Sequence, residues 1–112
     1  MRVLLVGNPA AHSGKAAERI SKAQAAMLAR GWHVQVQETL PNGRTVPIIV
    51  ERLRGDPVDR VVYLGGDGTF AEVAKALMLA NDPPPMGLLP SGTANDQGKS
   101  FGISSSLGKL EW

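Results

Sequence analysis

The sequence predicts an α/β fold in which a parallel β-sheet lies between two layers of helices. Short aliphatic segments alternate along the chain with segments whose apolar residues recur every three or four positions. The 13 glycines and eight prolines are concentrated in a few of the connections between these segments. Because strands that alternate with helices form parallel sheets with right-handed crossovers, this order predicts a three-layer αβα domain.

The first strand and helix are expected near the N-terminus. Residues 2–6 are apolar after Arg2, which is typical of a buried strand. A helix is expected from about residue 14 to residue 30, with Ser13 as its N-cap and Gly31 as the residue that follows its end. Its apolar positions are spaced four, three and four residues apart, at Ala16, Ile20, Ala23 and Met27.

A second strand and a second helix follow. Val34 and Val36 alternate with glutamines in residues 32–38, which predicts a half-buried strand. Thr45 is the expected cap of the next helix, in which Pro47 is tolerated because it falls in the first turn. The apolar face of this helix consists of Val46, Ile49, Val50 and Leu53, and Gly55-Asp56-Pro57 ends it.

The last elements surround a glycine-rich loop. Residues 60–64 are a predicted strand, and Thr69 with Glu72 has the spacing of a capping box that opens a helix to about residue 80. A short strand is expected over 86–89, and a short helix over 94–100.

Composition and charge narrow the possible functions. A chain of 112 residues has room for one compact domain. The net charge is +2 and no long run of lysine and arginine is present, which argues against nucleic-acid binding and allows only a weak preference for anionic ligands or membrane surfaces. No cysteine is available for a disulfide or a thiolate metal site. The N-terminal apolar run is too short for a signal peptide or a membrane span, so a cytoplasmic protein is expected.

Three polar loops are expected at one edge of the sheet. Residues 7–14, 65–69 and 90–96 each contain glycine, and each follows a predicted strand. Because parallel strands have their carboxyl ends at the same edge, these loops should converge. Ligands of such sheets bind at this edge, so the convergence predicts a binding site.

The second loop carries the strongest functional signal. Gly65, Gly66 and Gly68 bracket Asp67 directly after an aliphatic strand, and Thr69 follows. A loop of this kind presents backbone N–H groups to an anion at a helix N-terminus. We therefore expect residues 65–69 to bind phosphate and Asp67 to hold a metal ion or accept a proton. If Gly68 has a positive φ, alanine there would strain the backbone.

Two other interpretations of this loop are possible. It could be a connector in which Thr69 and Glu72 only cap a helix. It could also be a loose dinucleotide fingerprint, since Gly66, Gly68 and Ala71 have that spacing. The fingerprint is weak here because the loop follows the third strand and no acid stands at a strand end about 20 residues later.

The first and third loops supply further candidates. The first does not match a Walker A motif, since six residues separate its glycines and Ala16 stands where Ser or Thr is needed. It still places polar groups near a helix N-terminus that could hold phosphate or ribose. For both loops the alternative is a simple capped turn. The candidates are Asn8, Ser13, Gly14 and Lys15 in the first loop and Ser91, Gly92, Thr93 and Asn95 in the third.

These motifs together resemble the diacylglycerol kinase catalytic domain family, which includes bacterial lipid kinases and sphingosine kinases and is distantly similar to NAD kinases. The resemblance covers residues 2 to about 103, with the motifs in the family's order. Ala71 departs from it, because the family usually has Asn before the Glu. The matching motifs are Asn8-Pro9 with Ser13-Gly14, Gly65-Gly66-Asp67-Gly68-Thr69 with Glu72, and Pro90-x-Gly92-Thr93-x-Asn95-Asp96.

The resemblance implies a Rossmann-like nucleotide-binding domain over residues 1–103, followed by a tail over 104–112. It implies ATP and Mg²⁺ as cofactors, with the phosphates over 66–69, nucleotide contacts from Asn8, Ser13 and Thr93, and Asp67 near the magnesium and the γ-phosphate. These kinases carry a second, β-rich domain that supplies the lipid-facing surface. Without it, we expect no useful transfer to a lipid acceptor such as diacylglycerol.

The resemblance leaves further expectations and alternatives open. Contact with a membrane surface and self-association through an uncovered apolar face are both expected of a domain without its partner. One alternative function is a nucleotide-binding or regulatory module without catalysis. Another is an NAD-kinase-like enzyme, which is disfavoured because no Asn-Glu motif is found downstream.

Overall fold

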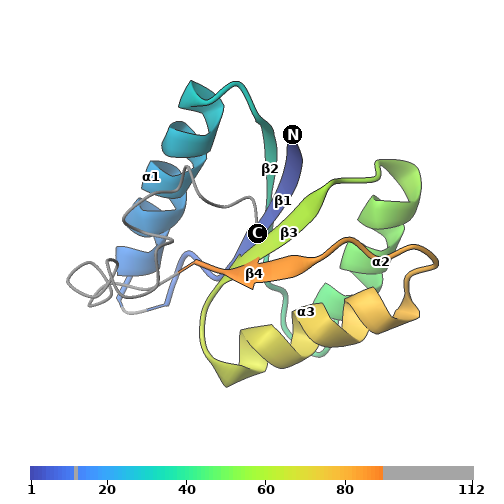
Figure 1. Cartoon of the computed structure of the whole chain (residues 1–112). Helices are drawn as coiled ribbons and strands as arrows, with labels where there is room; N and C mark the ends of the chain where they lie inside the picture. Colours follow the sequence, from blue (N-terminus) through green and yellow to red (C-terminus); the bar gives the residue numbers. More distant parts are fainter. Residues whose placement is uncertain (12, 90–112) are drawn as a thin grey trace.

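The computed structural model describes residues 1–11 and 13–89, and these residues form a mixed fold of alternating strands and helices (Figure 1). The predicted strands at 60–64 and near the N-terminus are confirmed, and the other boundaries agree to within a few residues. The predicted helix over 94–100 lies outside the described residues. The elements are β1 (Arg2–Gly7), α1 (Lys15–Ala29), β2 (His33–Glu38), α2 (Thr45–Gly55), β3 (Arg60–Leu64), α3 (Asp67–Leu79) and β4 (Met86–Leu88).

The four strands form one parallel sheet in the order β2-β1-β3-β4. The chain passes from β1 to β2 on one side, then crosses back over β1 to place β3 and β4 on the other side. The direction of strand addition therefore reverses between β1 and β3. In open α/β sheets this reversal opens a crevice at the carboxyl ends of the two strands.

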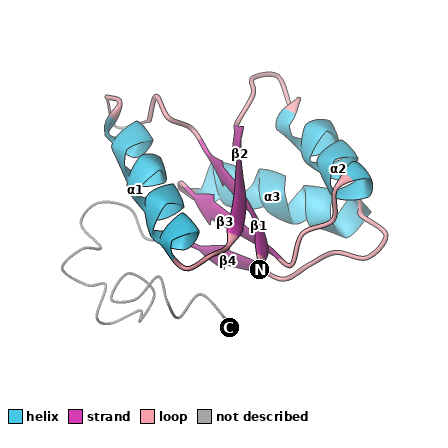
Figure 2. Ribbon diagram, turned by 90° about the horizontal axis from the view of Figure 1, so that it is seen from above, coloured by secondary structure: helices cyan, strands magenta, loops and turns pink. Residues whose placement is uncertain are grey.

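Helix α1 covers one face of the sheet, and α2 and α3 cover the other (Figure 2). The parallel α/β prediction is therefore confirmed, with one helix in one outer layer and two in the other. Strand residues alternate between the faces, so that Val3 and Leu5 face α1 while Leu4 and Val6 face α2 and α3. Such alternation is the normal consequence of strand geometry, and it fills both cores with the same short strands.

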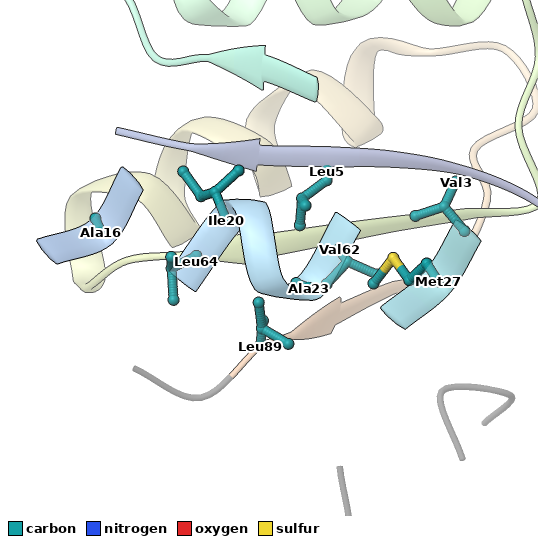
Figure 3. Close-up of a cluster of buried hydrophobic side chains, with 9 residues drawn as sticks. All are labelled: Val3, Leu5, Ala16, Ile20, Ala23, Met27, Val62, Leu64 and Leu89. Atoms are coloured by element: carbon teal, nitrogen blue, oxygen red, sulfur yellow. The ribbon is translucent and has the colours of Figure 1, made fainter. Parts of the chain in front are cut away.

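The core beneath α1 contains all four apolar helix positions that the spacing predicted (Figure 3). Met27 is fully buried, and Ala16, Ile20 and Ala23 are nearly so. On the other face Ile49 and Leu53 of α2 and Val73 and Leu77 of α3 pack against β1 and β3.

The end of α1 confirms the role predicted for Gly31. Gly31 has a φ of 82°, its N–H donates to the Leu28 carbonyl, and the Trp32 N–H donates to the Met27 carbonyl. These two bonds are those of a Schellman motif, in which glycine avoids the strain of a left-handed conformation. Trp32 packs against the α1-side core, which completes the motif.

The three predicted N-caps are wrong. The residues at the cap positions are Gly14, Arg44 and Gly66, and none makes a side-chain capping hydrogen bond. Thr45 lies inside α2, where its buried hydroxyl accepts a bond from the Leu40 N–H at 2.7 Å and donates to the Leu40 carbonyl at 3.1 Å. Thr45 thus fixes the preceding loop and does not cap the helix.

Candidate functional site

The candidate site lies where β1 and β3 end side by side. Gly7 is paired with Leu64 in the sheet, so the loops that follow both strands leave the same edge at adjacent positions. The expected convergence of the first two loops is therefore confirmed. The third loop, with Ser91, Gly92, Thr93 and Asn95, lies outside the described residues. The last described residue before it, Leu89, extends the β3–β4 ladder by donating its N–H to the Tyr63 carbonyl at 2.8 Å.

The loop after β1 is a tight turn held by its own hydrogen bonds. Asn8 accepts the Ala10 N–H on its side-chain oxygen and the Ala11 N–H on its backbone carbonyl, both at 3.0 Å. The first bond forms an Asx turn, so the Oδ1 atom of Asn8 stabilises the loop. Its amide NH₂ group is not needed for the turn. Asn8 is exposed and can direct these donors to a ligand.

Two consecutive residues of this loop have left-handed backbone conformations. Ser13 has a φ of 58° and Gly14 a φ of 90°. Such a conformation is uncommon for serine and costs energy unless the surroundings fix it. It is the physical reason why Ser13 cannot act as the N-cap, since a capping residue needs a β-region backbone. The Ser13 side chain is exposed at the edge of the candidate site.

Lys15 is the first residue of α1 and is exposed. The N-terminus of a helix carries partial positive charge, so a lysine there is electrostatically unfavourable for the helix itself. The helix thus gives no reason for a cation at this position. A bound anion at the carboxyl edge of the sheet would give one.

The loop after β3 is shorter than the sequence suggests. Helix α3 begins at Asp67 directly after Gly66, and the first helical hydrogen bond runs from the Phe70 N–H to the Gly66 carbonyl at 3.0 Å. Residues 65–69 are therefore two loop residues and one helical turn. The helix leaves the N–H groups of Asp67, Gly68 and Thr69 without an acceptor inside it, and they lie at the positive end of the helix dipole.

The structure constrains the three glycine positions of this segment differently. Gly65 has a φ of 154°, and a Cβ there would lie 2.5 Å from Thr69 Oγ1 and 2.8 Å from Thr69 Cβ. The fold thus requires glycine at position 65. A Cβ at Gly66 or Gly68 would meet nothing within 4 Å among residues 1–11 and 13–89, and neither residue has a positive φ. The positive φ considered for Gly68 belongs to Gly65 instead.

The absence of a packing reason at Gly66 and Gly68 is informative. Glycine inside a helix costs up to about 1 kcal/mol relative to alanine, so Gly68 weakens α3 without a benefit to the apo fold. Open space around a glycine at a helix N-terminus is what close approach of a phosphate to the backbone requires. Within the part of the chain that the structure describes, packing therefore gives no reason for these two glycines.

Asp67 lies next to a buried tyrosine that the sequence analysis did not identify. Tyr63 is nearly buried on the α3 side of β3, and its ring packs on Phe70 with centroids 5.9 Å apart. Burial raises the pKa of the Tyr63 hydroxyl, and the negative charge of Asp67 raises it further. Tyr63 could have been found from its place two residues before Gly65, because side chains alternate along a strand.

A magnesium ion would have to be held by few protein ligands. Among the residues that the structure describes, no cluster of three or more histidine, aspartate or glutamate side chains could hold a metal. Mg²⁺ in kinases is commonly bound by one or two carboxylates together with substrate phosphates. The exposed Asp67 at the end of β3 fits this second kind of site and does not fit an all-protein site.

Comparison with known proteins agrees with the motifs. Residues 2–110 match the family model of the diacylglycerol kinase catalytic domain. The "Lipid kinase YegS" of Escherichia coli (strain K12) is 39% identical over 101 residues, which is 87% of this chain and 33% of that protein. A solved structure of a diacylglycerol kinase from Bacillus anthracis (strain Sterne) superposes with a TM-score of 0.62 at 25% identity, covering 96% of this chain and 37% of that one.

The chain thus spans about a third of the length of the relatives it matches. In the "Probable lipid kinase YegS-like" of Pseudomonas fluorescens, which is 38% identical over 86 residues, the matched region is 28% of that protein. Of the helices that the structure describes, none has the length and apolar character needed to cross a bilayer.

Proposed function

Because the chain belongs to the diacylglycerol kinase catalytic domain family, we propose that it binds Mg-ATP as the nucleotide-binding part of a lipid kinase. The observation that carries this proposal is the first turn of α3. It offers three N–H groups at the switch point of the sheet, and no described residue packs against the space at Gly66 and Gly68. The proposed reaction is transfer of the γ-phosphoryl group to a lipid hydroxyl.

The phosphates would lie over residues 66–69. Their negative charge would be stabilised by the N–H groups of Asp67, Gly68 and Thr69 and by the helix dipole. Lys15 is the first residue of α1, directly after the loop that follows β1, and would add a full positive charge. Asn8 and Ser13 lie beside it and would contact the nucleotide, while Ser91, Gly92, Thr93 and Asn95 are proposed from the family motif alone.

Asp67 would hold the magnesium ion that the nucleotide carries. When bound, such an ion neutralises phosphate charge and orients the γ-phosphoryl group for transfer. The chain's own task is to hold the Asp67 carboxylate at the phosphates, and the first turn of α3 fixes its position. The neighbouring Tyr63 is nearly buried, and its hydroxyl lies within the electrostatic influence of this carboxylate.

The lipid acceptor is proposed from the relatives, whose names include lipid kinase and diacylglycerol kinase. We propose that turnover needs the second domain that the family resemblance implies. The chain on its own should bind nucleotide and transfer phosphate to diacylglycerol slowly or not at all. Turnover in the ordinary kinase range of about 1–100 per second would contradict this part of the proposal.

The test is a titration of the chain with ATP, with and without Mg²⁺, followed by amide NMR and calorimetry. The amides of residues 66–69 should shift, while those of the turn at 81–85, at the opposite edge of the sheet, should not. Mg²⁺ should increase the affinity for ATP. In the Asp67→Asn variant this increase should be at least tenfold smaller, which corresponds to about 1.4 kcal/mol.

The matched control is Asp82→Asn, because Asp82 is an exposed acid in that opposite turn. It should leave nucleotide affinity unchanged. Asp67→Asn should cost less than about 1 kcal/mol of stability, the size of the helix-dipole contribution. Equal effects of the two variants on Mg-ATP binding, or shifts confined to other residues, would refute the assignment.

A further inference from the structure

Tyr63, the only tyrosine of the chain, packs against the first turn of α3. Its side chain is nearly buried on the face of the sheet that α2 and α3 cover. Its ring meets that of Phe70 with the centroids 5.9 Å apart and the planes tilted by 55°. This is the tilted arrangement that aromatic pairs prefer, so Phe70 holds the Tyr63 ring in place.

The short connection between β3 and α3 brings Asp67 to the same place. Only Gly65 and Gly66 separate the end of β3 from Asp67. On the helix, Asp67 precedes Phe70 by three residues, and residues with this spacing are neighbours on a helix surface. The Tyr63 ring is therefore within one helical turn of Asp67. In agreement with this placement, burial and then the negative charge of Asp67 raise the pKa of the Tyr63 hydroxyl.

The hydroxyl of Tyr63 is available as a hydrogen-bond donor. It makes no hydrogen bond to another group among residues 1–11 and 13–89, and it is not a buried unpaired atom, so solvent reaches it. Its raised pKa keeps the phenol protonated. An ionised aspartate can only accept hydrogen bonds. The fold thus places an unused donor close to a group that can only accept.

We propose that Tyr63 is a positioning residue for Asp67, and that its hydroxyl donates a hydrogen bond to the Asp67 carboxylate when Mg-ATP is bound. This inference rests on the proposed function, in which Asp67 holds the magnesium ion. Asp67 is exposed on the first turn of α3, where its side chain is free to turn. A hydrogen bond from Tyr63 restricts the carboxylate and so reduces the entropy that is lost when the ion binds.

The first test measures ATP binding by calorimetry with and without Mg²⁺ in the Tyr63→Phe variant. Phenylalanine keeps a ring on Phe70 and removes only the hydroxyl. The ATP affinity without Mg²⁺ and the free energy of unfolding should both stay close to the wild-type values. The Mg²⁺ response, which is the factor by which Mg²⁺ raises ATP affinity, should be about three- to tenfold smaller, as expected for the loss of one hydrogen bond.

The double variant Tyr63→Phe with Asp67→Asn shows whether the two residues act together. If the hydroxyl acts through the carboxylate, the Mg²⁺ response of the double variant should equal that of Asp67→Asn alone. Independent effects would instead multiply, and this result would overturn the inference. A normal Mg²⁺ response in Tyr63→Phe with a lost response in Asp67→Asn would also overturn it, and would leave the proposed nucleotide site standing.

Two further variants separate positioning from folding. Tyr63→Leu removes the ring as well, so it should lower stability and reduce the Mg²⁺ response as much as Tyr63→Phe does. A response that is lost only in Tyr63→Leu would assign the effect to the ring and overturn the role of the hydroxyl. The matched control is Thr45→Val, which removes a buried hydroxyl that bonds to Leu40 in the loop before α2. It should lower stability and leave the Mg²⁺ response unchanged.

Failure of the proposed function gives a different pattern. A wild-type chain without a Mg²⁺ response, or an Asp67→Asn variant with a normal one, would remove the magnesium ion from Asp67 and overturn this inference with it. A Mg²⁺ response that falls as far in Thr45→Val as in Tyr63→Phe would show that loss of a hydroxyl elsewhere has the same effect, and Tyr63 would then have no positioning role.

Discussion

The two described loops at the carboxyl edge of the sheet use their backbone N–H groups in opposite ways. In the loop after β1, the N–H groups of Ala10, Ala11, Gly14 and Ala16 all donate to acceptors within residues 8–11. In the loop after β3, the N–H groups at the start of α3 have no acceptor in their own helix. The first loop thus uses these four N–H groups internally, whereas α3 leaves its first N–H groups without a helical acceptor.

The glycines differ in the same way. Gly14 has a left-handed backbone that glycine adopts at little cost, so the turn accounts for it. After β3 the described part of the fold accounts for Gly65, and it gives no packing reason for Gly66 and Gly68. A glycine that the apo fold does not need marks the place where something else approaches the backbone. This difference supports our proposal that the phosphates bind mainly at the start of α3, with the first loop beside them.

The largest expected effect is that of Gly65→Ala on stability. The new Cβ would lie 2.8 Å from Thr69 Cβ, and because the helix backbone fixes that atom, no change of rotamer relieves the contact. The positive φ adds backbone strain. We expect a loss of about 2–4 kcal/mol in the free energy of unfolding, measured by urea denaturation.

The matched control is the neighbouring Gly66→Ala. Its Cβ has no neighbour within 4 Å in the part of the chain that the structure describes, and its φ is −100°. It should change stability by less than about 1 kcal/mol. Similar losses in both variants would mean that the two glycines do not differ as the geometry indicates.

The architecture could be predicted from the sequence because its signals are periodic and local. The spacing of Ala16, Ile20, Ala23 and Met27 predicted the buried face of α1, and the alternation in residues 32–38 predicted β2. The helix starts could not be predicted in this way. Ser13, Thr45 and Thr69 are good caps by residue type, but the preceding turn decides which residue has the capping backbone.

The candidate site was predicted in part. The motif around Asp67 lies at the predicted edge of the sheet, since a loop that follows a parallel strand must lie there. Its internal geometry could not be predicted, because whether Asp67 lies in a loop or in a helix depends on how α3 packs. Tyr63 was missed although the alternation of side chains along β3 predicts the face on which it lies; its nearness to Asp67 depends on how α3 packs on that face.

The next effect in size concerns the first loop. Asn8→Ala removes the acceptor of the Ala10 N–H and should cost about 0.5–1.5 kcal/mol of stability. Asn8→Asp keeps the acceptor and should keep the turn. It should weaken Mg-ATP binding, however, because it adds negative charge where we propose the nucleotide. Urea denaturation and calorimetry separate the two roles, and an Asn8→Asp variant with normal affinity would remove Asn8 from the proposed site.

The smallest effect on stability, and the sharpest test of the comparison, is that of Gly68→Ala. Gly68 lies in the first turn of α3 with a helical backbone and open space around it. Alanine is the better helix former, so stability should stay equal or rise by up to about 1 kcal/mol. The affinity for Mg-ATP should nevertheless fall at least tenfold, about 1.4 kcal/mol, because the methyl group takes the space of the phosphate.

Because stability and Mg-ATP affinity should change in opposite directions, the variant distinguishes a ligand role from a folding role. Substitution of a residue needed only by the fold would lower stability and affinity together. A Gly68→Ala variant that is more stable and binds normally would leave the glycine without a function and move the phosphates away from α3. A less stable variant would show that position 68 is constrained by the fold, as position 65 is. Only gained or equal stability together with lost affinity agrees with a helix start that is kept open for a nucleotide.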